Sequence, residues 1–582
     1  MGAPEPQIYE FDDFRLDTAE RVLLRCGEAV PLTPRVFDTL LYLLRHPGKV
    51  LGKDELMREI WPDAVVEENN LNQNVSTLRR MFGERRGQNR YIVTVPGHGY
   101  RFAAAVRVCT GHAAAVVALP SKTIAVLPFA NMSADPENEY FCDGLAEELL
   151  NALAKVEGLK VAARTSSFAF KGKNTNVSEI ADALGVSTIL QGSVRRSGNH
   201  LRITVQLVNA SDGYHLWSER YDREMQDIFG VQDEITLAVV DALRVKLFGK
   251  EKAAVLKRYT ENTEAYHLYL KGRYFWFKSA PQEFHKSRDY FQRAIEADPA
   301  YALGYFGLAS YYGFASSWGM MAPKEGWPRM EAATMKALAL DDTLAEVLHG
   351  LAALKWVYYR DWAGAERAFR RAIELNPQVG AIHSHYSIYL TVMGRFDEAI
   401  AEGRRALELD PLSIRIHRNQ GARFYQARRY AEAVRRYGET LELDPNDASV
   451  HEELGDVYEQ MGLHEKAMAE YERAMTLVGD DELAAILCRA YAKEGSAGAL
   501  CAVAREQLER LNERVKQGHY VPATYFARAC LRLGDKEQVF RWLEKAREER
   551  NVYPLMMKSD PFYDSLRADP RFAAFLKGMN LE

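Results

Sequence analysis

The side chains with the clearest chemical potential lie near the N-terminus, in the stretch NNLNQNVSTLRRMFGE at residues 69–84. A helix over this stretch, turning about 100° per residue, gathers apolar residues on one side: Leu71, Val75, Leu78 and Phe82. A second side carries short amide and hydroxyl groups, from Asn70, Gln73, Asn74 and Thr77. Such groups offer the paired donors and acceptors that base edges in the major groove of DNA require. Taken alone, the helix fits a merely solvated polar face equally well.

Charge around this helix favours the DNA hypothesis. Residues 69–101 hold six basic residues and one acid, a net charge of +5, whereas residues 5–68 hold eight basic and fourteen acidic residues, a net charge of −6. The whole chain of 582 residues carries −5, so it has no global attraction to nucleic acid or anionic lipid, and any such binding must be local. Phosphate contacts supply most non-specific affinity for DNA, and a basic segment of this kind is their expected footprint.

The surrounding elements predict a domain that holds this helix in place. The stretch LTPRVFDTLLYLL predicts a helix with Thr33 as its N-cap and Pro34 at its first position. A short second helix begins at Asp54 in GKVLGKDELMREIWPD and ends before Pro62. The stretch RYIVTVPGHGYRF predicts two strands around a Gly-His-Gly turn, and several short strands precede the first helix. This order is that of a winged helix.

These four stretches, at this spacing, resemble the OmpR/PhoB-type winged-helix DNA-binding domain over residues 9–103. The resemblance implies that the third helix enters the major groove while the hairpin wing touches the adjacent minor groove. It implies that Asn70, Gln73, Asn74 and Thr77 face bases, and that the phosphate and wing contacts are Arg79, Arg80, Thr94, His98 and Arg101. The chain departs from the family by having Pro96 and His98 where a basic wing residue is common. We expect no receiver domain before the winged helix, and therefore no control by phosphorylation in cis.

The middle segment, residues 122–248, predicts an α/β domain with a mixed sheet. Strands TIAVLPFA, LKVAA and TILQGSVRR alternate with helices, and LRITVQLV and YHLWSERY predict hairpins. Asp143 is interpreted as a helix N-cap rather than a catalytic acid, and His215 and Trp217 as packing residues. The segment resembles the TolB N-terminal-like domain, which implies the fold and says little about a ligand. With no phosphate loop, dinucleotide motif or metal-spaced histidine pair, the sequence predicts no enzyme, no cofactor and no metal site.

The remainder predicts an all-α repeat array. Pro377, Pro411 and Pro445 close the stretches AIELNP, ALELDP and TLELDP at a spacing of 34 residues, the period of the tetratricopeptide repeat. Residues 262–550 resemble that family, with SSWGMMAPKEGW expected to form a loop, residues 525–550 a further helix pair and DPFYDSLRADPRFAAFLKGM a cap. The resemblance implies a superhelix whose groove binds a protein or peptide partner. Self-association and a pure scaffold are the alternatives.

The expected organisation is a winged-helix domain at 1–106, a linker at 107–121, the α/β domain at 122–248, a linker at 249–261 and the repeats at 262–582. The hypothesis is a cytoplasmic, one-component bacterial transcription regulator that binds double-stranded promoter DNA. The other two domains would sense a partner or ligand and control assembly, with a homodimer as one form of that assembly. The alternative is a repeat adaptor whose winged helix binds protein. No segment reaches the roughly 20 uninterrupted apolar residues needed to span a membrane, so no membrane partner is expected.

Overall fold

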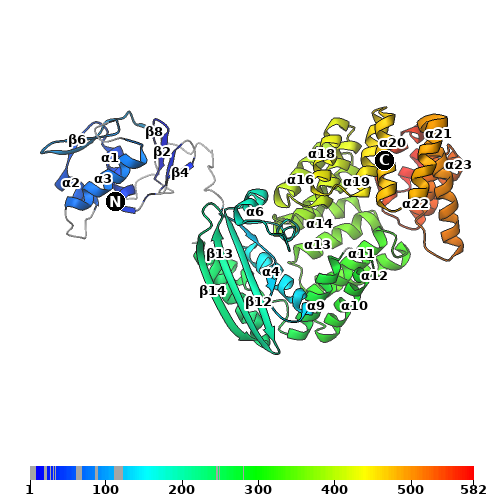
Figure 1. Cartoon of the computed structure of the whole chain (residues 1–582), viewed down its shortest axis with the longest axis horizontal. Coiled ribbons are helices and arrows are strands. Elements are labelled where there is room, and N and C mark those ends of the chain that lie inside the picture. The colour runs from blue at the N-terminus through cyan, green and yellow to red at the C-terminus, as the bar shows by residue number, and fades with distance from the viewer. Residues whose placement is uncertain are drawn as a thin grey trace. The chain divides into compact units, whose positions relative to one another are not determined.

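The computed structural model describes residues 8–18, 22–25, 28–30, 32, 34–60, 68–84, 90–109, 122–243, 245, 247, 249–278 and 281–581. Contacts along the chain divide it into two compact units, Met1–Ser121 and Lys122–Glu582. The first is a winged helix, and the second joins a mixed-sheet domain to an array of helix pairs (Figure 1). The predicted multidomain fold class is confirmed. Thr33, Pro62, Arg85 and Arg86, which the sequence interpretation used, lie outside the described residues.

The first unit contains three helices between two antiparallel sheets. One sheet has the order β4-β3-β2-β1-β8 and the other β5-β7-β6. The strands are β1 (Ile8–Phe11), β2 (Phe14–Asp17), β3 (Val22–Arg25), β4 (Glu28–Val30), β5 (Val50–Gly52), β6 (Ile92–Val95), β7 (Gly99–Phe102) and β8 (Arg107–Cys109). The helices are α1 (Pro34–Arg45), α2 (Lys53–Ile60) and α3 (Glu68–Met81). Strand β8 pairs with β1 inside the segment expected to be a linker, so the domain extends beyond residue 106.

An aromatic core holds the first unit together. Phe11 on β1 and Phe14 on β2 stack with their ring centroids 5.3 Å apart, and both rings meet Phe82 and Tyr91 edge-on or tilted. Edge-to-face pairs at these separations add to the stabilisation from burial itself. The N-terminal sheet is therefore packed against the end of α3 and the start of the wing.

In the second unit a six-stranded mixed sheet has the order β11-β9-β12-β13-β14, with the short β10 paired to β12. Strands β9, β10 and β11 run parallel to their neighbours, and β12, β13 and β14 form an antiparallel meander. The strands are β9 (Lys122–Val126), β10 (Ala130–Asn131), β11 (Leu159–Val161), β12 (Thr188–Ser197), β13 (His200–Asn209) and β14 (His215–Glu224). The helical segments are η1 (Pro136–Asn138), α4 (Glu139–Leu153), α5 (Arg164–Phe168), α6 (Val177–Leu184), η2 (Met225–Asp227) and α7 (Ile228–Ala242).

The structure corrects the role predicted for Asp143. Helix α4 begins at Glu139, so Asp143 lies one turn inside it rather than at its cap. Its carboxylate is buried and accepts hydrogen bonds from Lys171 Nζ at 2.6 and 2.7 Å. Burial raises the pKa of Asp143, and the Lys171 ammonium opposes that rise. The residue is half of a buried ion pair that ties α4 to the segment after α5.

The rest of the second unit consists of antiparallel helix pairs stacked in chain order (Figure 1). The helices are α8 (Gly249–Val255), α9 (Thr263–Trp276), α10 (Pro281–Ala297), α11 (Ala302–Ser317), α12 (Pro323–Leu340), α13 (Ala345–Ala353), the π-helix η3 (Leu354–Tyr359), α14 (Trp362–Leu375), α15 (Gly380–Val392), α16 (Phe396–Leu409), α17 (Ile414–Gln426), α18 (Tyr430–Leu443), α19 (Ala448–Gln460), α20 (His464–Leu477), α21 (Asp481–Lys516), α22 (Ala523–Arg532) and α23 (Lys536–Glu548). Helix α8 lies in the second segment expected to be a linker. The stretch SSWGMMAPKEGW spans the end of α11, a turn and the start of α12.

Two neighbouring repeats bring their helices together by placing a glycine opposite an aromatic ring. A Cβ added at Gly421 on α17 would lie 2.5 Å from the Tyr437 ring on α18, and one added at Gly455 on α19 would lie 2.6 Å from the Tyr471 ring on α20. Contacts that short are sterically forbidden, so these positions require glycine. The 34-residue spacing of the two pairs repeats the same packing along the array.

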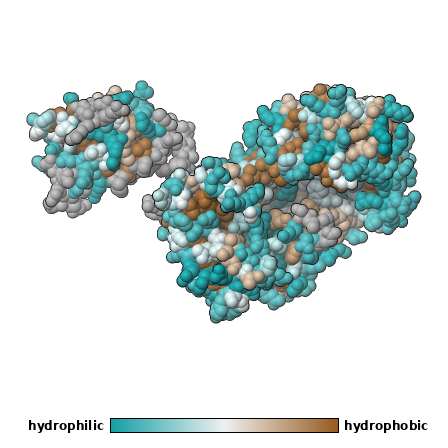
Figure 2. Space-filling view, viewed as in Figure 1, coloured by the Kyte–Doolittle hydropathy of each residue, from teal (hydrophilic) through white to brown (hydrophobic). Residues whose placement is uncertain are grey.

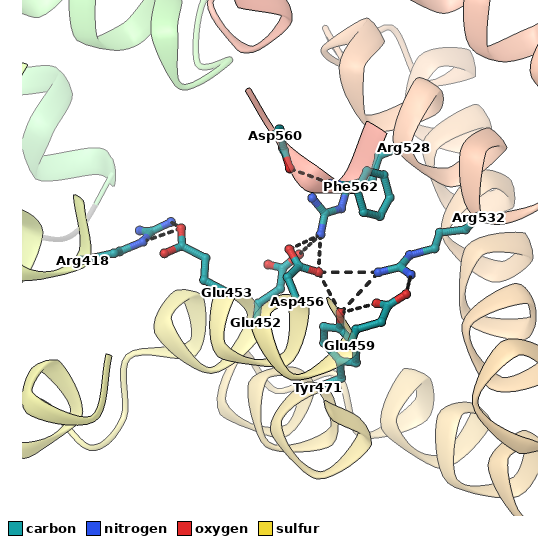
Figure 3. A network of polar contacts seen from close by, with 10 residues as sticks. All are labelled: Arg418, Glu452, Glu453, Asp456, Glu459, Tyr471, Arg528, Arg532, Asp560 and Phe562. Atoms are coloured by element: carbon teal, nitrogen blue, oxygen red, sulfur yellow. Dashed lines mark hydrogen bonds and ion pairs between the residues drawn. The ribbon is translucent and has the colours of Figure 1, made fainter. Parts of the chain in front are cut away.

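The C-terminal helices are fastened to the middle of the array by a polar network (Figure 3). Asp456 on α19 pairs with Arg528 at 2.7 Å and Arg532 at 3.5 Å, both on α22. Arg532 also pairs with Glu459. The Phe562 ring, from the chain after α23, lies 4.4 and 4.6 Å from the two guanidinium carbons. The last described elements are η4 (Tyr553–Met556), η5 (Pro561–Leu566) and α24 (Pro570–Lys577), and η5 and α24 lie in the stretch predicted to form a cap.

The sheet domain and the repeats share contacts rather than meeting through a free linker. Ser166 Oγ on α5 donates to Asp410 Oδ1 at 2.6 Å and accepts from the Leu412 amide at 2.9 Å. The Gln378 side chain donates to the Leu159 carbonyl of β11 at 3.0 Å. One continuous apolar core runs from the strands into the helix pairs. The predicted boundaries at residues 248 and 261 therefore separate elements of one packed unit.

Candidate nucleic-acid interface

A buried stripe fixes the orientation of α3. Leu71, Val75 and Leu78 are at most 1% exposed and Phe82 is 4% exposed, so the predicted apolar side of the helix is confirmed. These residues pack against α1 and α2, whose Leu40, Leu44 and Leu56 are fully buried. Because α3 cannot rotate without exposing this stripe, the opposite side of the helix must face the outside of the unit.

Asn70 and Gln73 lie on that exposed side, and Thr77 is half-buried beside it. Three of the four side chains predicted to face bases are therefore accessible in the first unit. They stand at i, i+3 and i+7, which places them along one line of the helix surface. Amide and hydroxyl groups in such a row are able to reach successive base edges.

Asn74 differs from that prediction, because its amide is used inside the unit. Asn74 Nδ2 donates to Thr39 Oγ1 at 2.9 Å and to the Arg35 carbonyl at 3.2 Å, both on α1. Thr39 is fully buried and itself donates to the Arg35 carbonyl at 2.7 Å. Both amide protons have acceptors on α1, so we assign Asn74 to the contact between the two helices.

Arg79 also has a different place from the one predicted. Its guanidinium donates to the Ile92 carbonyl at 2.8 and 3.2 Å and to Thr94 Oγ1 at 2.7 Å, all on strand β6. Glu84, whose carboxylate is 2% exposed, lies 3.7 Å from Arg79 and accepts from the Tyr91 amide at 2.5 Å. Arg79 and Thr94 thus hold the first wing strand against α3 and do not point a free charge outward.

The wing is the hairpin of β6 and β7. His98 is exposed at its turn, and Gly97 there has a φ of 75°, the left-handed conformation that favours glycine. Arg101 is half-buried on β7, paired with Val50 on one side and Val93 on the other. Tyr100 Oη donates to Asn72 Oδ1 of α3 at 2.6 Å, a second link between helix and wing.

The sequence interpretation missed Asn72, Glu84 and Tyr100. Asn72 lies inside the amide-rich stretch but outside the stripe chosen for base contacts, and Glu84 was counted only as the single acid of a basic segment. Their partners are 28 and 7 residues away in the chain. Only the packing of the hairpin on α3 reveals these roles.

The positive charge at this surface is more local than the sequence count suggests. Arg80 is exposed on α3, one residue beyond the anchored Arg79. Arg90, another member of the basic segment, pairs with Asp12 at 2.7 Å. Among the described residues of α3, Arg80 is therefore the cation best placed for a phosphate.

The second unit contains a separate candidate site, on the concave side of the repeats. Figure 2 shows the surface hollowed between the sheet domain and the helix pairs, where a cavity of about 1350 Å³ lies. Among the described residues, no cluster of three or more His, Cys, Asp or Glu side chains is arranged to hold a metal ion. Within the same residues, no helix is both long and apolar enough to cross a bilayer.

Sequence families match each part of the chain. Residues 27–102 match the family described as transcriptional regulatory protein, C terminal. Residues 120–237 match the second domain of HilA/YgeH-like transcriptional regulators. Tetratricopeptide repeat families match residues 357–414, 421–462 and 448–477. The first domain is thus a winged helix of the transcriptional-regulator type, and the array consists of tetratricopeptide repeats.

Several curated proteins are similar to parts of the chain. Putative adenylate cyclase 3 of Rhizobium meliloti is 43% identical over 208 residues, which are 35% of each chain. Transcriptional regulator HilA of Salmonella typhimurium is 24% identical over 396 residues, 67% of this chain and 68% of that one. The regulatory protein KdpE of Escherichia coli is 38% identical over 101 residues, 17% and 44% of the two chains. The chain therefore spans about a third of the length of the first of these relatives.

Two solved structures are similar to parts of the chain. The DNA-binding domain of Escherichia coli CadC is 27% identical, with a TM-score of 0.16, and covers 18% of this chain and 98% of its own. The tetratricopeptide protein YrrB, whose title names an unusual peptide-binding site, is 22% identical with a TM-score of 0.25 and covers 34% and 97%. The family matches and the regulator relatives together support a DNA-binding transcription regulator with a winged helix and tetratricopeptide repeats.

Proposed function

We propose that this chain, built of a transcriptional-regulator winged helix, a sheet domain and tetratricopeptide repeats, is a one-component, sequence-specific transcription regulator. Helix α3 would lie in the major groove of promoter DNA with Asn70, Gln73 and Thr77 toward the bases. Arg80 would contact a phosphate. The observation that carries the proposal is the accessible amide side of α3, opposite a buried apolar stripe and beside a wing anchored to the same helix.

The wing would supply the remaining contacts. His98 is exposed at the hairpin turn and Arg101 is half-buried on β7, so His98 is the better placed of the two for the minor groove. Thr94 and Arg79 would act indirectly, by fixing the distance between β6 and α3. A helix and a wing held by shared hydrogen bonds would approach DNA as one rigid surface, which limits the entropy lost on binding.

The second unit would sense a protein partner or ligand and control assembly. A single winged helix contacts few phosphates, so a homodimer on half-sites about one helical turn apart would gain avidity. Action on promoter DNA agrees with the cytoplasmic location expected from the sequence. The alternative is an adaptor whose winged helix binds protein; the exposed row of base-reading side chains on α3 favours DNA.

The absence of enzymatic activity remains a prediction. One relative is named as a putative adenylate cyclase, and the aligned part is 35% of that chain. The regulator relatives and the winged-helix family support a role that needs no catalysis. An assay of the full chain for cyclic AMP formation from ATP would contradict this prediction if product accumulated.

The test of DNA binding uses the full chain, a pool of random duplexes and gel-shift titration at several salt concentrations. Arg80→Ala should weaken binding to all sequences and flatten the slope of log affinity against log salt by about one. Gln73→Ala should relax preference at one base pair by roughly 1–3 kcal/mol while keeping the slope. Arg405→Ala, an equal loss of charge on α16, serves as the control and should bind as the wild type does.

Two outcomes would contradict the proposal. One is that the wild type selects no preferred sequence from the random pool, which would leave α3 without a reading function. The other is that Arg80→Ala and Arg405→Ala change the salt slope equally, which would place the phosphate contacts elsewhere. The adaptor alternative predicts both results.

A further inference from the structure

The cavity of the second unit is bounded by the sheet domain and by the inner helices of the repeats. Its walls come from α4 and α5 of the sheet domain, from α9, α11, α13, α15 and α17, and from the segment before η5. The hydrogen bonds of Ser166 with Asp410 and Leu412 join the sheet domain to the N-terminal end of α17. The hollow, called the chamber below, is therefore lined by two domains.

Helix α17 lines this chamber with arginines. Arg415, Arg418, Asn419 and Arg423 stand at i, i+3, i+4 and i+8 and all face the cavity. Arg418 is bound in a pair with Glu453, at 2.7 and 2.8 Å, and Asn419 Nδ2 donates to Ser384 Oγ at 3.1 Å. Among the described residues, Arg415 and Arg423 form no ion pair within 4 Å.

Arg423 is the more unusual of the two. It is 4% exposed, its Nε donates to Gln426 Oε1 at 3.2 Å, and its Nη1 has no hydrogen-bond partner among the described residues. Burial lowers the pKa of Arg423 to about 10, and Tyr437 and Glu453 only partly oppose that shift. A buried cation without a carboxylate is costly, so such a group usually faces a counter-ion.

A pair of histidines lies beside the arginines in the chamber. His349 Nε2 and His385 Nδ1 are 2.6 Å apart, and their rings stack with centroids at 4.7 Å. Burial, and then the Arg415 guanidinium, lower the pKa of His349 to about 4. Burial, together with His349, Arg415 and Arg423, also lowers the pKa of His385 well below its usual value. These shifts favour neutral rings, each with one N–H; one N–H joins the two rings, so one donor of the pair remains.

Two acids near α17 have different roles. Burial lowers the pKa of Arg415, and the Asp410 carboxylate, which accepts from Ser166, opposes that shift. Asp456 pairs with Arg528 and Arg532. Aromatic side chains line the same cavity: Trp276, Phe277, Trp318, Trp356 and Tyr553. Among the described residues, the chamber thus combines Arg423, a buried cation with no ion pair, with walls that are partly aromatic.

We propose that this chamber binds a small organic anion, with a carboxylate or phosphate group held by Arg415 and Arg423 and an apolar body against the aromatic walls. The buried position of Arg423, within a cavity that two domains line, favours a small ligand over an extended peptide. Binding would stabilise the contact between the sheet domain and the repeats, since α17 and α5 meet at the end of the chamber. The role of this anion as an effector of DNA binding rests on the proposed function. The binding of the anion to the chamber does not depend on that function.

The first measurement needs no ligand. In chloride buffer, Arg423→Met should raise the midpoint of thermal unfolding of the full chain, because it removes a buried charge that has no partner. Arg418→Met on the same helix is the matched variant and should lower the midpoint, because it leaves the buried Glu453 carboxylate unpaired. A lower midpoint for Arg423→Met would mean that Arg423 stabilises the empty protein, and would overturn the proposal.

The second measurement uses three probes at constant ionic strength: inorganic phosphate, phenyl phosphate and benzoate. At least one should raise the midpoint of the wild type relative to chloride, with phenyl phosphate above phosphate if the aromatic walls take part. A response to the phosphates but not to benzoate, or the reverse, shows whether the chamber binds a phosphate or a carboxylate group. Arg423→Met and Arg415→Gln should weaken the apparent affinity at least about tenfold, as expected for lost hydrogen bonds to a charged group. Arg405→Gln, outside the chamber, should respond as the wild type does.

Three results would overturn the proposal. The first is no response of the wild type to any of the three probes, and the second is an equal response of Arg423→Met. The third is a response only to a fourth probe, a deca-glutamate peptide. Gel shifts on the same preparations keep the two hypotheses apart. Anion binding without DNA binding would remove the proposed function alone. DNA binding without anion binding would remove only the ligand.

Discussion

Two asparagines four residues apart on α3 have different tasks. Asn70 is exposed, whereas Asn74 joins α3 to α1 through Thr39 and the Arg35 carbonyl. Their side chains are chemically identical, and only the rotation of the helix against its neighbour separates them. The same rotation directs Arg79 to β6, where it donates hydrogen bonds, and leaves Arg80 exposed.

Asn74→Ala should therefore act on stability. The change removes two hydrogen bonds and leaves the buried Thr39 hydroxyl with one partner fewer, which should cost about 1–3 kcal/mol in the free energy of unfolding. Base preference at the selected DNA site should stay unchanged. Denaturant unfolding of the full chain and gel shifts on singly substituted duplexes measure the two effects. A changed base preference without loss of stability would restore the base-contact role.

At the scale of elements, the wing depends on one glycine. Gly99 has a φ of 146°, and a Cβ added there would lie 2.0 Å from the Leu51 carbonyl oxygen of β5. That carbonyl is backbone inside a three-stranded sheet, so it cannot move aside without breaking the pairing of β5 with β7. The wing, and with it the hydrogen bonds from Arg79 to β6, depends on this close approach.

Gly99→Ala should consequently disrupt the hairpin. Gly97→Ala is the matched control, since Gly97 has a φ of 75° and no atom within 4 Å of an added Cβ. The control should lose about 1–2 kcal/mol from its left-handed backbone alone. Gly99→Ala should lose more than that, and should also weaken DNA binding on every sequence. Thermal unfolding together with gel shifts tests both; equal losses in the two variants would show that the wing tolerates the clash.

At the scale of the whole second unit, the superhelix closes where the C-terminal segment meets α19 and α22 (Figure 3). Asp560 belongs to this closure, and its carboxylate accepts from the Phe562 amide at 2.9 Å. Burial raises the pKa of Asp560 to about 6, with the nearby Asp456 carboxylate adding to the rise and Arg528 opposing it. An unfolded aspartate titrates near 3.9.

This shift predicts a pH-dependent stability. Because the folded pKa is above the unfolded one, the contribution of Asp560 is fully favourable below about pH 4 and is lost as the pH rises through about 6. Asp560→Asn keeps the cap and removes the titration. Relative to the wild type, the variant should become more stable between about pH 4 and 6, by roughly 3 kcal/mol, and keep that advantage at higher pH.

Melting temperatures of both chains from pH 4 to pH 8 measure this difference. Asp535→Asn is the control, because Asp535 also caps a helix, α23, and also remains a hydrogen-bond acceptor as asparagine. The difference between Asp535→Asn and the wild type over the same range gives the baseline for replacing one capping carboxylate. The same pH profile for Asp560→Asn would mean that burial does not raise the pKa of Asp560.

Several features of the protein followed from the sequence because they are local or periodic. The buried stripe of Leu71, Val75 and Leu78 follows from helical geometry alone. Pro377, Pro411 and Pro445 are equally spaced because each repeat pairs its two helices in the same way. The Gly-His-Gly turn determines a hairpin within a few residues. In each case the physical cause lies within about one turn, one loop or one repeat of the residues that display it.

Other features were decided only by the tertiary structure, because the partners are distant in the chain. Asn74 reaches Thr39 across 35 residues, and Ser166 reaches Asp410 across 244. Asp143 was expected to cap a helix and instead pairs inside it with Lys171. Arg423 looks like an ordinary surface arginine of a repeat, yet in the packed second unit it is buried. A side chain's type sets what it is able to bind, but whether that capacity is satisfied internally or left for a ligand depends on which distant segment packs beside it.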